Sequence, residues 1–119
     1  MKKKNFFTAT AILLLLMVTA ISCSKSSDTP SNTGPTATII NIPGMSFSPG
    51  STTVKVGTVV KWTNNDAMTH TATSDNGTTF DTGNISAGAS ATYTTSVTGT
   101  FTYHCNIHST MTGTLVVVP

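Results

Sequence analysis

The stretch FTYHCNIHSTMTG, residues 101–113, concentrates side chains that are rare elsewhere in the chain. The sequence of 119 residues holds two cysteines, three histidines and five methionines, and this stretch contains one Cys, two His and one Met. Side chains alternate between the two faces of a β-strand. On a strand over 100–105, Phe101 and Cys105 therefore share an inward, apolar face while His104 points outward. The adjacent His and Cys thus cannot bind the same metal ion.

After the cysteine, the sequence loses its alternation and ends at a glycine, which indicates a loop. The spacing Cys-x2-His-x2-Met allows Cys105, His108 and Met111 to converge on one point of that loop. The remaining histidine, His70, follows a predicted strand and turn in WTNNDAMTHTATSD, residues 62–75. Two imidazoles, one thiolate and one weak thioether are the donors of a type 1 (blue) copper site, whereas zinc favours more thiolate or carboxylate. These four residues are therefore the predicted ligands of one copper ion.

The composition of residues 36–119 indicates an all-β domain. This segment contains no Glu, Gln or Arg, uses Thr and Val heavily, and is broken at short intervals by Gly, Pro, Asn and Asp. Many short strands separated by turn residues are typical of a β-sandwich. The predicted strands are Ala37–Ile42, Thr52–Val56, Val59–Asn64, His70–Ser74, Ser90–Thr95, Thr100–Cys105 and Gly113–Val118.

Two segments together resemble the cupredoxins, the small blue copper proteins that include plastocyanin, pseudoazurin and amicyanin. They are VKVGTVVKWTNNDAMTHT, residues 54–71, and GTFTYHCNIHSTMTGTLVVV, residues 99–118. Within the family the short Cys-x2-His-x2-Met loop is most similar to that of amicyanin. The resemblance implies a Greek-key β-sandwich of about eight strands. It also implies His70, Cys105 and His108 as equatorial ligands, with Met111 as the axial ligand.

Three positions depart from the family pattern. Ile107 and Ser109 stand where amicyanin has prolines on either side of its second ligand histidine. Thr71 stands where the family often has Asn, whose side chain ties the two ligand loops together; a threonine hydroxyl can make the same bond. The resemblance also implies an apolar patch for docking around the edge of His108. Met68, Met45 and Ile107 match the positions of this patch.

The N-terminus reads as an export signal followed by a lipid attachment site. Three lysines precede an apolar run, and small residues lead to Cys23 in the sequence AISC. This junction resembles the bacterial lipobox, which predicts a signal peptide over 1–22 and acylation of Cys23. Residues 24–35 are rich in Ser, Thr, Pro and Gly, which is typical of a flexible linker. An uncleaved membrane anchor is the alternative. The copper-binding domain is then expected over 36–119.

Charge argues against nucleic acid as a partner. The formal net charge of +2 comes from the lysines before the apolar run, and the remaining side chains sum to −1 from three Lys and four Asp. No cluster of Lys or Arg remains that could neutralise a run of phosphates. With Cys23 acylated, Cys105 is the only free thiol and has no partner for an internal disulfide.

These features predict a membrane-tethered carrier of single electrons rather than an enzyme. Four protein ligands leave the metal no open position for a substrate. The expected protein is a monomer that exchanges electrons with redox partner proteins in the cell envelope; Ser24 after the acylated cysteine favours the outer membrane. A copper-delivery lipoprotein and a metal-free interaction module are the alternatives. Intense colour with reversible redox favours the carrier, and ready release of copper to a chelator favours delivery. Absence of stoichiometric copper favours the interaction module.

Overall fold

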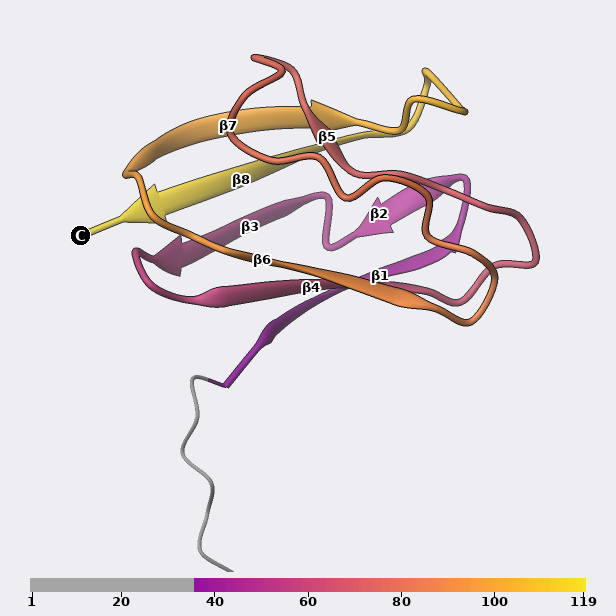
Figure 1. Ribbon diagram of the computed structural model, residues 1–119, viewed down its shortest axis with the longest axis horizontal. Helices are drawn as coiled ribbons and strands as arrows, with labels where there is room; N and C mark the ends of the chain where they lie inside the picture. The colour runs from indigo at the N-terminus through magenta and orange to yellow at the C-terminus, as the bar shows by residue number, and fades with distance from the viewer. Residues whose placement is uncertain (1–35) are drawn as a thin grey trace, which may run out of the picture. The chain divides into compact units, whose positions relative to one another are not determined.

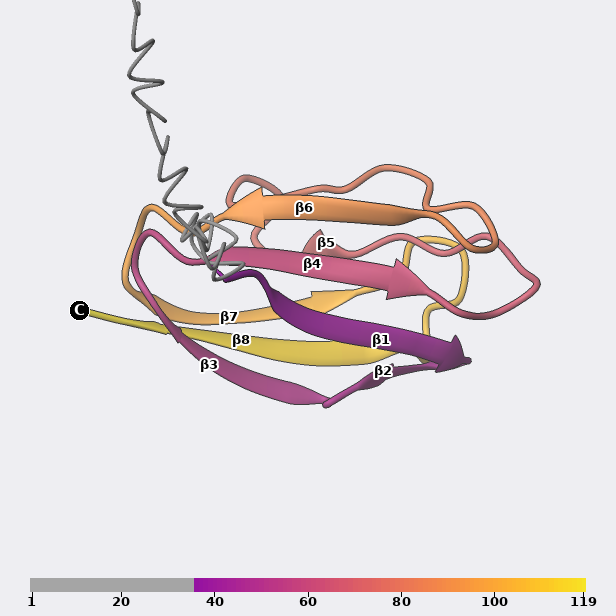
Figure 2. The same cartoon turned by 90° about the horizontal axis from the view of Figure 1, so that it is seen from below.

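The computed structural model describes residues 36–119, which form two four-stranded β-sheets (Figure 1, Figure 2). One sheet has the strand order β2-β1-β4-β6, and the other has the order β3-β8-β7-β5. The strands are β1 (Thr38–Gly44), β2 (Ser46–Ser48), β3 (Ser51–Lys55), β4 (Val59–Asn64), β5 (Thr73–Ser74), β6 (Ser90–Thr94), β7 (Gly99–His104) and β8 (Thr112–Val118). The predicted all-β sandwich is confirmed, and residues 36–119 include no helix able to cross a membrane.

From β2 to β7, every connection passes from one sheet to the other. Two neighbouring pairs are therefore parallel, β1 with β4 and β3 with β8, while the other pairs are antiparallel. All strands and the whole buried core lie between residues 38 and 118 of the described segment. The predicted signal peptide, Cys23 and the linker to residue 35 lie outside the described residues.

The core between the sheets follows the alternation of the strands. Along β4, Val60, Trp62 and Asn64 point inward and are completely buried. On β7, Tyr103 is also completely buried, and its ring meets that of Trp62 edge-on with centroids 5.8 Å apart. Phe47 of β2 packs against the other side of Tyr103 at 4.7 Å. The aromatic rings thereby join the two sheets directly beneath the end of β7.

Gly113 on β8 is the position where this core allows no side chain. A Cβ atom there would lie 2.3 Å from Cζ of Tyr103, in register across the β7–β8 pair. Because the ring is enclosed on both sides, it cannot move away cheaply. We expect Gly113→Ala to lower the free energy of unfolding by about 1–3 kcal/mol, as overpacking of cores does. Urea unfolding measures this, with Gly44→Ala as the control, since a Cβ at Gly44 meets nothing within 4 Å.

The predicted and the observed strands differ in two places. The predicted strand over 70–74 is reduced to β5, Thr73–Ser74, and residue 70 makes only an isolated bridge to Ile85. The short β2 was not predicted from the residues, although the family resemblance implied an eighth strand. The first difference lies where the backbone follows a loop whose hydrogen bonds go partly to side chains rather than to a neighbouring strand.

Candidate metal centre

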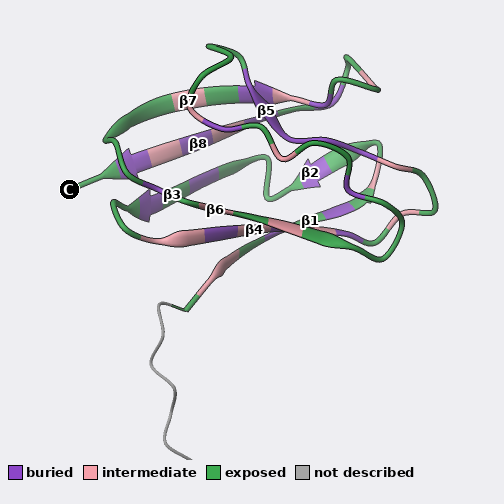
Figure 3. Ribbon diagram, viewed as in Figure 1, coloured by how far each residue is buried: buried purple, intermediate pink, exposed green. Residues whose placement is uncertain are grey.

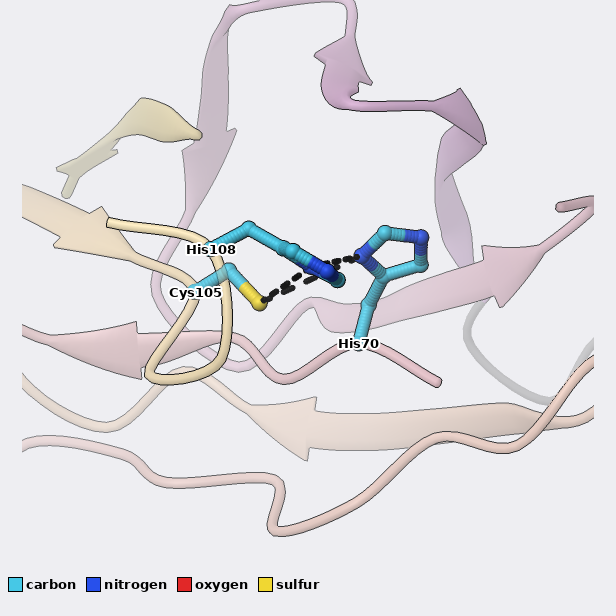
Figure 4. A group of neighbouring side chains, drawn as sticks. All are labelled: His70, Cys105 and His108. Atoms are coloured by element: carbon cyan, nitrogen blue, oxygen red, sulfur yellow. Dashed lines mark hydrogen bonds between the residues drawn. The ribbon is translucent and has the colours of Figure 1, made fainter. Parts of the chain in front are cut away.

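Three of the four predicted ligands converge at one end of the sandwich. His70 comes from the loop between β4 and β5, while Cys105 and His108 come from the loop after β7. The two ring Nδ1 atoms lie 3.1 Å apart, and Cys105 Sγ lies 4.0 Å from Nδ1 of His70 and 3.8 Å from Nδ1 of His108. Figure 4 shows the three side chains pointing toward one another. Together they form a group of potential metal ligands.

The spacing of these donor atoms suits a small metal ion. A triangle with sides of 3.1, 3.8 and 4.0 Å has its centre about 2.1 Å from each corner, close to typical metal–imidazole bonds of about 2.0–2.1 Å and metal–thiolate bonds of about 2.3 Å. Two nitrogens and one thiolate in a trigonal arrangement match the equatorial set of type 1 copper. The donor set therefore fits copper without any movement of the backbone.

The loop after β7 is closed by its own backbone. Cys105 N–H donates to the carbonyl of Met111 at 3.0 Å, and Met111 N–H donates to the carbonyl of His108 at 2.9 Å. Cys105 and Met111 are buried, whereas His108 is partly exposed. These bonds bring the backbone of the predicted axial residue back beside that of Cys105 and leave His108 partly exposed. The arrangement of all four residues suits a type 1 site.

The thiol of Cys105 is prepared to act as a thiolate. Burial alone would raise its pKa, but the backbone N–H groups of Thr71, His108 and Ile107 and the ring of His70 outweigh burial and lower the pKa from 9.0 to about 6. The clearest of these contacts is Thr71 N–H, which donates to the sulfur at 3.3 Å. Because metals bind the thiolate rather than the thiol, this environment favours metal binding at neutral pH.

A carboxylate holds the other side of His70. Nε2 of this completely buried ring lies 2.8 Å from Oδ2 of Asp66, which accepts the ring N–H. The hydrogen bond from His70, followed by that from Ala67 N–H, lowers the pKa of Asp66 from 3.8, so the carboxylate is ionised at neutral pH. With its proton on Nε2, His70 presents the lone pair of Nδ1 to the centre. A carboxylate on the far nitrogen is a common partner of metal-bound histidines.

Backbone bonds on both sides fix the loop that carries His70. Its N–H donates to the carbonyl of Ile85 at 3.1 Å, and the Ile85 N–H donates to the His70 carbonyl at 2.7 Å. The buried side chain of Asn64 donates to the carbonyls of Met68 at 2.7 Å and Ile85 at 2.8 Å. Its Oδ1 accepts the N–H of Asp66 at 2.9 Å. One asparagine thus ties the loop that carries His70 to the segment around Ile85.

Thr71 connects the two ligand loops. Its Oγ1 accepts the N–H of Asn106 at 2.8 Å, directly after the cysteine, while its own N–H reaches the sulfur. Nδ2 of Asn106 donates to Oγ1 of Thr73 at 2.9 Å, which adds a second link between the loops. The threonine hydroxyl therefore makes the inter-loop bond that the family resemblance assigns to an asparagine.

Asp66 and Asn64 contribute to the centre although sequence reasoning did not select them. The available signal for Asp66 was its place four residues before His70, in NNDAMTH. Alternation along the predicted strand over 59–64 puts Asn64 on the same face as Trp62, but nothing in the sequence indicated which groups its side chain would bind. His104, in contrast, lies outside the centre as its alternation requires, with hydrogen bonds to Asp75 and Asn106.

The three predicted docking residues lie on exposed loops at the same end as the ligands. Met45 lies between β1 and β2, Met68 precedes His70, and Ile107 precedes His108. Their side chains are 49%, 45% and 49% exposed, respectively. These three exposed apolar side chains and the partly exposed His108 are the features that the predicted docking patch requires.

Comparison with known proteins agrees with this geometry. A family model for the cupredoxin-like domain matches residues 11–117. A solved Cu(I) form of an amicyanin variant is 26% identical, with a TM-score of 0.64 over 69% of this chain and 82% of that one. A reduced Cu(I) amicyanin variant at pH 4 is 27% identical, with a TM-score of 0.65 over 70% and 83% of the two chains.

A purple cupredoxin from Nitrosopumilus maritimus is 27% identical, with a TM-score of 0.63 over 67% of this chain and 98% of that one. A search of curated proteins found no match. The resemblance predicted from the ligand motif is therefore confirmed by the family model and by the solved structures.

Proposed function

Because the chain belongs to the cupredoxin-like family, we propose that it carries single electrons on one type 1 copper ion held by His70, Cys105, His108 and Met111. The observation that carries the proposal is the triangle of two imidazole nitrogens and one sulfur, with sides of 3.1 to 4.0 Å. Copper, when bound, supplies a couple that gains and loses one electron. The protein supplies the ligands and holds them in place.

The protein keeps its ligands in one geometry. The Cys105 loop is closed by its own backbone bonds, the His70 loop is pinned through Asn64 and Ile85, and Thr71 joins the two. Ligands that cannot move much keep the structural change between oxidation states small, which favours fast electron transfer. The same closed set of four ligands leaves no position for a substrate and holds copper tightly, which favours a carrier over copper delivery.

Copper titration of the folded chain tests this proposal. We expect one Cu²⁺ per chain, an intense visible absorption band, and reversible bleaching when a reductant is added. Slow loss of copper to a strong chelator would agree with a carrier, whereas rapid handover would favour delivery. Weak or substoichiometric copper binding without the band would overturn the proposal.

We further propose that partners dock on the patch of Met45, Met68 and Ile107 and receive the electron through the edge of His108. Met68→Lys should slow electron exchange, because a strongly hydrated ammonium group opposes apolar contact. A rise of about 1.4 kcal/mol in the barrier would slow exchange tenfold. NMR line broadening in mixtures of oxidised and reduced protein measures the rate.

The matched control is Thr92→Lys, which adds the same charge to an exposed position on β6. It should leave the rate close to that of the unmodified protein. The absorption spectrum should be unchanged in both variants. An altered spectrum with unchanged exchange in Met68→Lys would instead place this side chain among the groups that shape the copper site.

We also propose that the domain is tethered to a membrane in the cell envelope through an acylated Cys23, with redox proteins as its partners. Cys23→Ser should move the protein from the membrane fraction to the soluble or precursor fraction, because the thiol is the only attachment point for the lipid. Fractionation and mass spectrometry of the mature N-terminus measure this. A mature N-terminus that begins at another residue and carries no lipid would contradict the tether and the predicted outer-membrane location.

A further inference from the structure

The exposed large apolar side chains of residues 36–119 gather toward the two ends of the sandwich. One group is the docking patch at the metal end. At the opposite end Val56, Val97 and Val118 are 43%, 58% and 36% exposed, and we call these three residues the apolar tip. Ile39, which is 52% exposed, lies near the start of β1 in the same half. No cofactor or strand pairing of the described domain uses these side chains.

Hydrogen bonds establish that the tip residues are neighbours. Val56 N–H donates to the carbonyl of Val118 at 2.8 Å, which places the end of β3 beside the end of β8. Gly57 N–H donates to the carbonyl of Thr95 at 2.7 Å, and Val97 follows in the turn between β6 and β7. Figure 3 shows exposed segments at these chain reversals, at the end opposite the ligand loops.

The chain also enters the domain at this end. Thr38, the first residue of β1, pairs with Val60, which follows the turn that contains Val56. Only twelve residues, 24–35, separate Cys23 from the start of the described segment. Twelve residues span at most about 40 Å when fully extended. A lipid on Cys23 would therefore hold the end of the domain that carries the tip within this distance of the membrane.

Charge is divided in the same direction. The two lysines of the described domain are Lys55, directly before the tip, and Lys61, which is in register with Ile39. The three aspartates, Asp66, Asp75 and Asp81, all lie between β4 and β6. A lysine near an anionic lipid surface is attracted to it. The half of the domain that carries the tip is thus the half that such a surface attracts.

We propose that the apolar tip docks on the lipid surface to which the chain is tethered, so that the metal end faces away from the membrane. This inference rests on the proposed lipid anchor at Cys23. Three half-exposed valines and two lysines bind lipid weakly by themselves, but a short tether raises their effective concentration at the surface. Docking converts a freely tumbling domain into one that presents the docking patch outward to partner proteins.

Tryptophan quenching by brominated lipids tests the orientation. Residues 23–119, loaded with Cu⁺, are coupled through Cys23 to a maleimide lipid in vesicles of phosphatidylglycerol and phosphatidylethanolamine. Cys105 is buried and bound to copper, so it is protected from coupling. Val97→Trp reports on the tip, and Met45→Trp reports on the metal end from a similarly exposed position. Trp62 is completely buried and gives a constant background.

Bromine in the acyl chains should reduce the fluorescence of Val97→Trp and leave that of Met45→Trp unchanged. Adding Val56→Asp to Val97→Trp should restore the fluorescence, because a carboxylate at the tip opposes both lipid contact and anionic head groups. The matched change Thr53→Asp, exposed on the same strand but farther from the tip, should not restore it. Absorption spectra after oxidation verify that each variant is folded and binds copper.

Equal quenching at both reporters, quenching only at Met45→Trp, or no quenching at either would overturn the proposal. The maleimide supplies the anchor in this experiment, so a negative result counts against the tip alone. Acylation of Cys23 and copper binding are tested separately, by the fractionation and titration experiments described above.

Discussion

Replacing Cys105 with serine is expected to abolish the visible absorption band of the copper-loaded protein while leaving the sandwich folded. The band requires transfer of charge from a sulfur to copper, and no other free thiol lies in residues 36–119. Serine is close to cysteine in size, and its oxygen can still accept the Thr71 N–H that now reaches the sulfur at 3.3 Å. Absorption spectroscopy and circular dichroism measure colour and fold on the same sample.

The matched control is Met111→Leu, which changes the predicted axial ligand but keeps the thiolate. This variant should retain an intense band and show an altered reduction potential, because the axial ligand tunes the couple without supplying the transition. If Cys105→Ser kept the band, the copper would have to lie elsewhere. If Cys105→Ser lost both the band and the fold, the absorption spectrum and circular dichroism of Met111→Leu would show whether colour and fold can be separated.

The position of Cys105 could be predicted because it depends on a local rule. Alternation along β7 places Tyr103 and Cys105 inward and His104 outward, and the observed burial follows that pattern. The loop that follows is equally local, since its two closing bonds join residues three and six positions apart. The sequence therefore contained nearly all the information needed for this half of the metal centre.

The His70 half could be predicted only in part. A continuous strand over 70–74 was wrong, because the ring is held by an isolated bridge to Ile85 and by side-chain bonds rather than by a ladder. The bond from Asn64 to Ile85 joins residues 21 positions apart, and no periodic pattern reveals such a pair. The carboxylate of Asp66 was visible in the sequence, but its role depends on the turn that brings it to the ring.

These supporting hydrogen bonds hold the two halves of the metal centre in different ways. Cys105, His108 and Met111 belong to one short loop closed by its own backbone bonds, while His70 is fixed by Asp66 and the Ile85 bridge. The hydrogen bonds of Thr71 to Asn106 and Cys105 connect one half of the metal centre to the other. The tuning of the copper couple by the protein should thus depend strongly on the fixed side, where a negative charge contacts a ligand directly.

Replacing Asp66 with asparagine is accordingly expected to weaken copper binding by about tenfold or more, as loss of outer-shell partners of metal ligands does. Asparagine keeps an oxygen that can accept the Nε2–H of His70, now 2.8 Å from the carboxylate, but it removes the negative charge. The imidazole then becomes a poorer donor, and the site loses a charge that favours Cu²⁺ over Cu⁺. Both effects destabilise the oxidised state more than the reduced state, so the reduction potential should rise.

Competition with a chelator of known affinity measures the binding, and voltammetry measures the potential. Asp81→Asn is the matched control, because it removes the same charge from a residue whose bonds go to Thr73 and Gly83 rather than to a predicted ligand. Asp66→Ala, which also removes the acceptor, should weaken binding further than Asp66→Asn. An unchanged affinity and potential in Asp66→Asn would mean that Asp66 only shapes its loop, through the bond that it accepts from Ala67 N–H at 2.7 Å.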